Sequence, residues 1–161
     1  TFRRKKDAEE LSCGFEVYVS SRGDYYGTGS DVFVVNPETQ KVVGHLGVAA
    51  SEMCMDGDYL YLISVEWSYV SGKNEVRYTL YDTRKKEILP HSFITDGSEK
   101  EIKIPYGLGV NPETKEIFVS DATDYVTPGY LYCFSAEGRM QWKVRAGDIP
   151  AHFAFTSVDF Y

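Results

Sequence analysis

A seven-residue pattern returns along this chain, and the spacing of its copies restricts the fold more than any other feature. Residues 104–110 read IPYGLGV, and residues 149–155 read IPAHFAF, 45 positions later. A weaker copy, AASEMCM, lies at residues 49–55, 55 positions before the first. A period of about 40–55 residues filled with short strands is typical of the four-stranded blades of a β-propeller. The repeat therefore predicts an all-β chain.

Apolar runs between turn signals predict the strands of three blades, in which strands A to D run from the innermost outward. In the first blade, strand B is predicted at 15–20, C at 31–35 and D near 42–46. In the second blade, strands A to D are predicted at 50–55, 59–65, 75–81 and 88–94. In the third blade, they are predicted at 106–110, 116–120, 130–134 and 139–145. A further inner strand is predicted at 151–155. Residues 1–14 are predicted as a partial strand or linker, with the region 3–13 ambiguous between strand and helix, and residues 15–161 as one incomplete domain.

The predicted turns open with the same kind of side chain, a short polar one. Asn36, Asp82 and Ser135 each follow a C strand, and Asn111 follows an A strand. Such side chains hydrogen-bond the backbone ahead of them and start tight turns. The tetrapeptide NPET occurs twice, 75 residues apart, which does not fit the period. We interpret it as one turn used in two different connections.

Residues 59–65 read YLYLISV, an almost continuous apolar run. Continuous apolarity predicts burial on both faces, as in a blade between two neighbours. A sandwich of two flat sheets is the main alternative, but it explains the long period less well. Because three blades do not close a ring, we expect either the C-terminal part of a larger propeller, with about seven blades, or a piece completed by another chain.

Charge and cysteine content exclude several classes. The 161 residues carry a net charge of −7, whereas nucleic-acid binding needs clustered cations. The basic run at 3–6 is followed by acidic residues and predicts a solvated terminal segment. The three cysteines form no CxxC pair, so Cys54 and Cys133 are expected to pack as small apolar side chains. No apolar run reaches 18 residues, so membrane attachment would need a lipid anchor outside this chain.

Three motifs carry a resemblance to a known family: IPYG at 104–107, DATDY at 121–125 and GDIPAHF at 147–153. With them, residues 104–155 resemble the C-terminal blades of YncE-like surface β-propellers, most of all the lipoprotein branch of gut Bacteroidetes. That branch includes surface proteins that capture cobalamin for an outer-membrane transporter. The resemblance implies a protein outside the cytoplasm, at the cell surface or in the periplasm. It implies cobalamin as a small-molecule ligand and a transporter or another protein as partner.

The B–C connections predict long loops on one face of the blades, at residues 21–30, 66–74 and 121–129. Long polar loops on a rigid scaffold are where binding usually occurs, and exposed aromatic rings offer large contact areas. The candidate ligand-binding residues are Arg22, Tyr25, Tyr26, Trp67, Tyr69, Asp124 and Tyr125. The aromatic residues would stack on a ligand, and Arg22 and Asp124 would orient it. The alternative is that these rings fold back over the blade tops.

The inner strands begin at the same face, so Glu52, Tyr106 and His152 are predicted to line the channel mouth. The repeat places Glu52, Gly107 and His152 at equivalent positions. In propeller lactonases, carboxylate and imidazole groups at this place hold a divalent metal. Two ligands seldom suffice, so we favour hydrogen-bonding pore residues and predict no metal or cofactor. Asp31, Asp121 and Asp124 lack the spacing of a calcium loop and are predicted to form turns.

The sequence thus predicts a non-catalytic propeller that binds a small molecule or a partner protein through its B–C loop face. A metal-dependent hydrolase or lyase of the lactonase type, centred on Glu52 and His152, is the first alternative. A protein-interaction scaffold without a small-molecule site is the second.

Overall fold

The computed structural model describes residues 14–24 and 26–158, and the described chain is all-β with three antiparallel sheets. The first sheet contains β1 (Val17–Ser21), β2 (Asp31–Asn36) and β3 (Lys41–His45). The second contains β4 (Glu52–Asp56), β5 (Tyr59–Ser68), β6 (Lys73–Asp82) and β7 (Glu87–Ser92). The third contains β8 (Pro105–Val110), β9 (Ile117–Asp121), β10 (Tyr130–Phe134) and β11 (Met140–Arg145).

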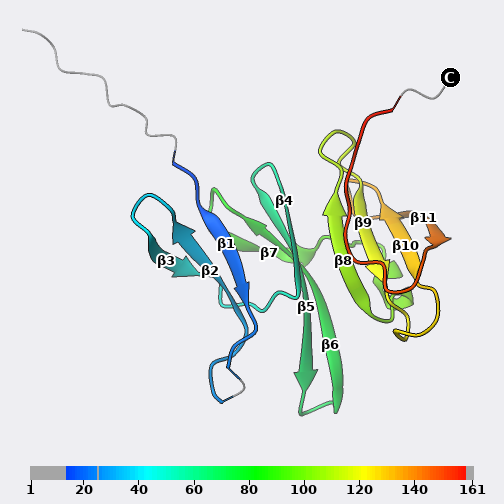
Figure 1. Ribbon diagram of the computed structural model, residues 1–161, viewed down its shortest axis with the longest axis horizontal. Coiled ribbons are helices and arrows are strands. Elements are labelled where there is room, and N and C mark those ends of the chain that lie inside the picture. The colour runs from blue at the N-terminus through cyan, green and yellow to red at the C-terminus, as the bar shows by residue number, and fades with distance from the viewer. Residues whose placement is uncertain (1–13, 25, 159–161) are drawn as a thin grey trace, which may run out of the picture.

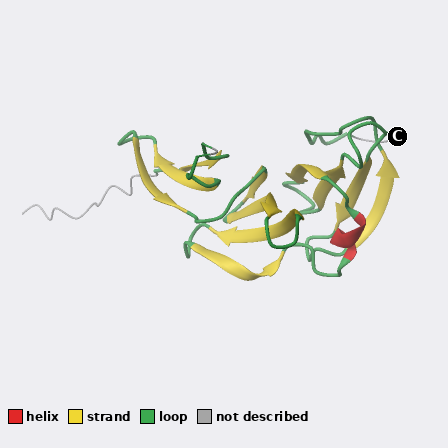
Figure 2. Ribbon diagram, turned by 90° about the horizontal axis from the view of Figure 1, so that it is seen from below, coloured by secondary structure: helices red, strands yellow, loops and turns green. Residues whose placement is uncertain are grey.

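Within each sheet, strands that are neighbours in sequence pair with each other, and the sheets follow one another in a row (Figures 1 and 2). This confirms the all-β prediction and the order of the predicted strands. Three successive sheets of three or four strands are compatible with propeller blades, and they differ from the two sheets of a sandwich. The one helix among the described residues, η1 (Ser98–Glu101), is much too short to span a membrane.

The second sheet is buried on both faces, as its apolar sequence predicts. Leu60 and Leu62 of β5 pack with Val32 of the first sheet. The alternating residues Tyr61 and Ile63 pack in a larger core shared with the third sheet. Since successive side chains of a strand point to opposite faces, one strand serves two cores. The apolar run is therefore explained by neighbours on both sides.

The predicted turn chemistry is confirmed in four turns. In each, the opening side chain accepts hydrogen bonds from backbone N–H groups two to four positions ahead; these residues are Asn36, Asp82, Asn111 and Ser135. A residue with positive φ follows in each turn: Gln40, Lys86, Lys115 and Gly138. The two NPET segments therefore adopt one local structure in two different connections.

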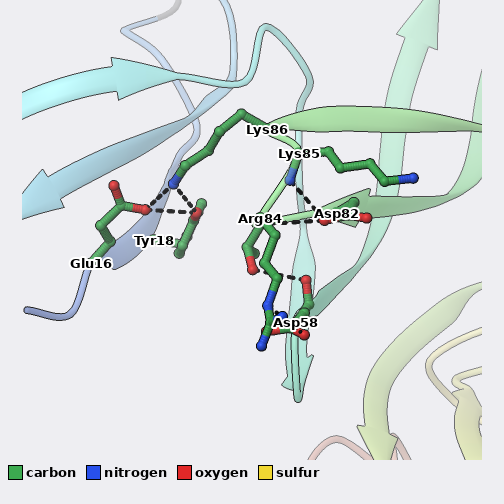
Figure 3. A network of polar contacts seen from close by, with 8 residues as sticks. Glu16, Tyr18, Asp58, Asp82, Arg84, Lys85 and Lys86 are labelled. Atoms are coloured by element: carbon green, nitrogen blue, oxygen red, sulfur yellow. Dashed lines mark hydrogen bonds and ion pairs between the residues drawn. The ribbon is translucent and has the colours of Figure 1, made fainter. Parts of the chain in front are cut away.

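Polar contacts join the start of the first sheet to the turn between β6 and β7 of the second sheet (Figure 3). Lys86 donates to Glu16 and, at 3.3 Å, to the hydroxyl of Tyr18. The hydrogen bond from Lys86 lowers the pKa of Glu16. Arg84 pairs with Asp58 at 2.8 Å within the second sheet. Lys86 therefore ties the turn between β6 and β7 to the first sheet.

The structure differs from the sequence prediction at two segments. Strands β5 and β6 extend into the predicted loop at 66–74, so only residues 69–72 form the turn and Trp67 lies within a strand. Residues 151–155, predicted as an inner strand, have no regular secondary structure. They cross the outer face of the third sheet beside β8 instead of pairing with a strand of another sheet (Figure 1). A strand forms only where a neighbour satisfies its backbone groups.

Apolar side chains are exposed on the outer faces of the two end sheets. Because Val32 and Val34 point toward the second sheet, Val17 and Val19 point away from it, and both are more than a third exposed. On the third sheet, Trp142 of β11 is also partly exposed. The region 3–13, which the sequence leaves open between a strand of the first blade and a helix, lies outside the described residues.

Candidate functional site

The three repeated segments meet around one cavity of about 370 Å³. Glu52 begins β4, Tyr106 lies at the start of β8, and His152 lies in the C-terminal segment. All three residues, predicted for the channel mouth, line this cavity. Arg22 and Tyr125, predicted from two B–C loops, line it as well. The long-period repeat thus brings equivalent positions of the chain to one place.

Glu52 is half-buried at this cavity. Desolvation by burial raises the pKa of its carboxyl group above the ordinary value, although the positive charge of Arg22 and the nearby His152 act in the opposite direction. Neither group lies within ion-pair distance of Glu52 among the described residues. The carboxyl group is therefore close to polar partners and free to accept or donate a hydrogen bond.

Two tyrosine rings stand at the rim. Tyr106 and Tyr125 meet edge to face, with ring centroids 5.9 Å apart, and both are more than a third exposed. Tyr125 has a φ of 64°, which a bulky side chain rarely adopts. Its N–H donates to the carbonyl of Ala122, which holds the strained turn. Gln40, Lys86 and Lys115 have similar φ angles in tight turns, so this conformation sets where the Tyr125 ring lies and does not by itself mark a site.

The wall of the cavity continues toward Trp67. Val65 and Val76 line the cavity and pair across β5 and β6, and the next pair on the same face is Trp67 with Asn74. Asn74 also lines the cavity, whereas Trp67 does not and is about half exposed. The indole therefore lies on the face of the sheet that leads into the cavity.

The C-terminal segment brings His152 to the site because two glycines let it approach. A Cβ atom at Gly107 would collide with the carbonyl oxygen of Ala151, and one at Gly109 would lie 2.9 Å from the ring of Phe153. The hydroxyl of Ser120 donates to the carbonyl of Pro150, and Phe153 and Phe155 pack on Phe118. This contact surface places the histidine beside Glu52.

The remaining candidates lie elsewhere. Tyr26 and Tyr69 are almost fully exposed at loop tips, outside the residues that line the cavity, and Tyr25 lies outside the described residues. The carboxylate of Asp124 accepts hydrogen bonds from the backbone of Val126 and Thr127 and from the Thr127 hydroxyl. These bonds lower the pKa of Asp124, the one from the Thr127 N–H most of all, and they hold its carboxylate within its own loop.

Asp121 forms a turn, as predicted, whereas Asp31 begins strand β2 and bonds backbone groups outside a turn. Asp121 is buried and accepts hydrogen bonds from the backbone N–H groups of Lys103, Ile104 and Thr123. Asp31 accepts from the N–H groups of Val32 and Gly47. Asp121 thereby ties the start of β8, next to the lining residues Lys103 and Ile104, to the loop that carries Tyr125.

Sequence reasoning missed several residues that line the cavity: Ser51, Val65, Asn74, Val76, Lys103 and Ile104. Ser51 and Ile104 belong to the repeated segments, and their equivalence to Ala151 and Ile149 was the available signal. Lys103 and Asn74 carry no such signal, because their approach depends on how the second and third sheets pack.

Two side chains at the cavity, Glu52 and His152, are of the types that ligate divalent ions. Within residues 14–24 and 26–158, no group of three or more His, Cys, Asp and Glu side chains is arranged to hold a metal ion. Glu52 and His152 alone do not complete the coordination that divalent ions require.

Cys133 is buried in the third sheet, and burial raises the pKa of its thiol to about 11, so it packs as a small apolar side chain.

Comparison with protein-family models and with curated proteins finds no match to this chain.

Proposed function

We propose that this protein is part of a β-propeller of about seven blades that binds a small molecule, without catalysis, in the cavity at its B–C loop face. The observation that carries the proposal is the convergence of the three repeated segments on one cavity of about 370 Å³. Pockets of this size with an apolar lining and a few convergent polar groups are the usual places for small ligands.

The propeller assignment is supported by the way the sheets pack. Each face that lies between two sheets is buried, whereas the outer faces of the first and third sheets expose apolar side chains such as Val19 and Trp142. Further blade-like sheets of the same protein would cover them as the three sheets cover one another. The resemblance of residues 104–155 to YncE-like propellers also supports this assignment.

Cobalamin is the most specific ligand that the resemblance implies. The volume of the cavity is near the lower end of the range for small-molecule pockets. Cobalamin would therefore insert only one of its peripheral groups into the cavity. The rest would lie across the rim, on Tyr106, Tyr125 and the exposed face of Trp67. A transporter or another protein would bind beside it through the loop tips that carry Tyr26 and Tyr69.

Calorimetric titration with cobalamin tests this form of the proposal. We expect saturable binding, and we expect Tyr125→Ala to weaken it about tenfold, because base-sized rings that stack on an aromatic side chain gain roughly 1–3 kcal/mol. Tyr26→Ala is the matched control, since Tyr26 is 96% exposed outside the cavity. A flat titration removes cobalamin. Equal loss of affinity in both variants removes the cavity as the site.

A metal-dependent hydrolase or lyase is a second candidate, favoured by the presence of Glu52 and His152 at one cavity. It requires a bound divalent ion to polarise substrate or water. Metal analysis of the purified protein after incubation with Zn²⁺, Mn²⁺, Mg²⁺ and Ca²⁺ tests it. Fewer than about 0.1 ions per chain removes this candidate, because a catalytic metal must be present in most molecules.

A further inference from the structure

Two positively charged side chains reach the cavity from different sheets. Arg22 comes from the loop after β1, and Lys103 comes from the segment before β8. Neither belongs to any of the ion pairs between described residues, although Arg84, Lys86, Lys115 and other basic residues do. Both cations are therefore available to a ligand.

Fewer negatively charged than positively charged side chains line the cavity among the described residues. Within residues 14–24 and 26–158, Glu52 is the one carboxylate that lines it. Asp124 is close enough to sense the charge of Lys103, but its carboxylate is held by three hydrogen bonds within its own loop. The chain as a whole carries a net charge of −7, so an excess of cations at a concave site opposes the overall charge. Charge of one sign in a cleft with apolar walls concentrates ligands of the other sign.

The remaining lining suits a ring. The valines at positions 65 and 76 form an apolar wall, and the rim has the edge-to-face pair of Tyr106 and Tyr125. Flat ring faces gain from contact with aromatic side chains. The amide of Asn74 can donate to and accept from a hydroxyl group on such a ring.

From these charges and this shape, we infer that the cavity takes a small ring-shaped ligand that bears one carboxylate or phosphate group, which Arg22 and Lys103 bind. The inference rests on the proposed function, since it names the chemistry of the ligand for the same cavity. The guanidinium of Arg22 matches either anion in a two-point contact, and the ammonium of Lys103 adds a point charge.

Titration of the whole chain with ring ligands matched in size and different in charge tests the inference, with NMR chemical shifts of the cavity residues as the readout. The carboxylate probes are benzoate and glucuronate, and the phosphate probe is glucose 6-phosphate. The neutral probes are benzyl alcohol and glucose, and the cationic probes are benzylamine and glucosamine. We expect the anionic probes to bind at least about fivefold more tightly than the neutral and cationic probes. The relative affinities of the carboxylate and phosphate probes then show which of the two anions the cavity prefers.

Variants show whether the two cations are responsible. Arg22→Gln and Lys103→Gln should each weaken binding of the anionic probes about three- to tenfold, and Glu52→Gln should strengthen it. Lys41→Gln is the control, because Lys41 is exposed on β3 away from the cavity.

The outcomes separate two failures. Neutral or cationic probes that bind the cavity as well as the anions, or anion binding unchanged by Arg22→Gln and Lys103→Gln, overturn the inference and leave the proposed function standing. Absence of a shift at the cavity residues with every probe overturns the inference alone if cobalamin binds saturably, and it overturns both if the cobalamin titration is also flat.

Discussion

At the scale of single residues, the half-buried carboxyl group of Glu52 at the cavity lowers the stability of the folded protein when it is ionised. Burial raises the pKa of its carboxyl group in the folded protein above the ordinary value of 4.5. The folded state therefore holds this proton to higher pH than the unfolded chain does, so the contribution of Glu52 to stability is complete below about pH 4.5 and is lost as the pH rises through the raised pKa.

We expect Glu52→Gln to stabilise the protein at pH 7 and to have little effect near pH 4, because the amide removes the ionisation that burial opposes. Urea unfolding at both pH values measures this. Glu38→Gln, at an exposed turn position, is the matched control. A variant that is less stable than the wild type at pH 7 would mean that the attraction of Arg22 and His152 exceeds the desolvation cost.

At the scale of elements, the C-terminal segment is held by side chains and by close approach rather than by strand pairing. Residues 151–155 cross the third sheet at Gly107 and Gly109, where any larger side chain would collide with them. The sequence pattern IPAHFAF predicts a strand, and the third repeat nevertheless has none. Phe153 and Phe155 pack on Phe118, although Phe155 stays 39% exposed, so the apolar pattern records contact with the sheet and not how the backbone is paired.

Gly107→Ala should displace this segment, with a loss of about 1–3 kcal/mol in the free energy of unfolding, typical of overpacking. Hydrogen exchange at residues 149–155 should become faster, and His152 should leave the cavity. Gly147→Ala is the matched control, because no atom lies within 4 Å of a Cβ atom at that glycine. Equal exchange in the two variants would contradict the close approach.

At the scale of the whole molecule, the open faces of the end sheets determine how the isolated chain behaves. Val19, on the outer face of the first sheet, is 44% exposed and is surrounded by other apolar side chains of that face. Exposed apolar sheet faces promote association. The same faces are the places where further blades would pack in the proposed propeller.

We expect the isolated chain to associate as its concentration rises, and Val19→Lys to reduce this association by placing a charge on the open face. Sedimentation velocity over a range of concentrations measures it. Val70→Lys adds the same charge at a fully exposed turn residue that belongs to no sheet face, and it should leave association unchanged. If both variants reduce association equally, net charge and not the face is responsible.

The sequence by itself determined the strands, the turns and the buried positions, because these depend on neighbours within a few residues. Asn36 and Asp82 close their turns through their own side chains, and Leu62 and Ile63 alternate between two cores as their pattern predicts. The repeat also brought Glu52 and His152 to one site. Only the tertiary structure decided that Lys103 and Asn74 reach that site and that residues 151–155 cross a sheet instead of joining one. These contacts depend on the packing of whole sheets against each other, which no local pattern encodes.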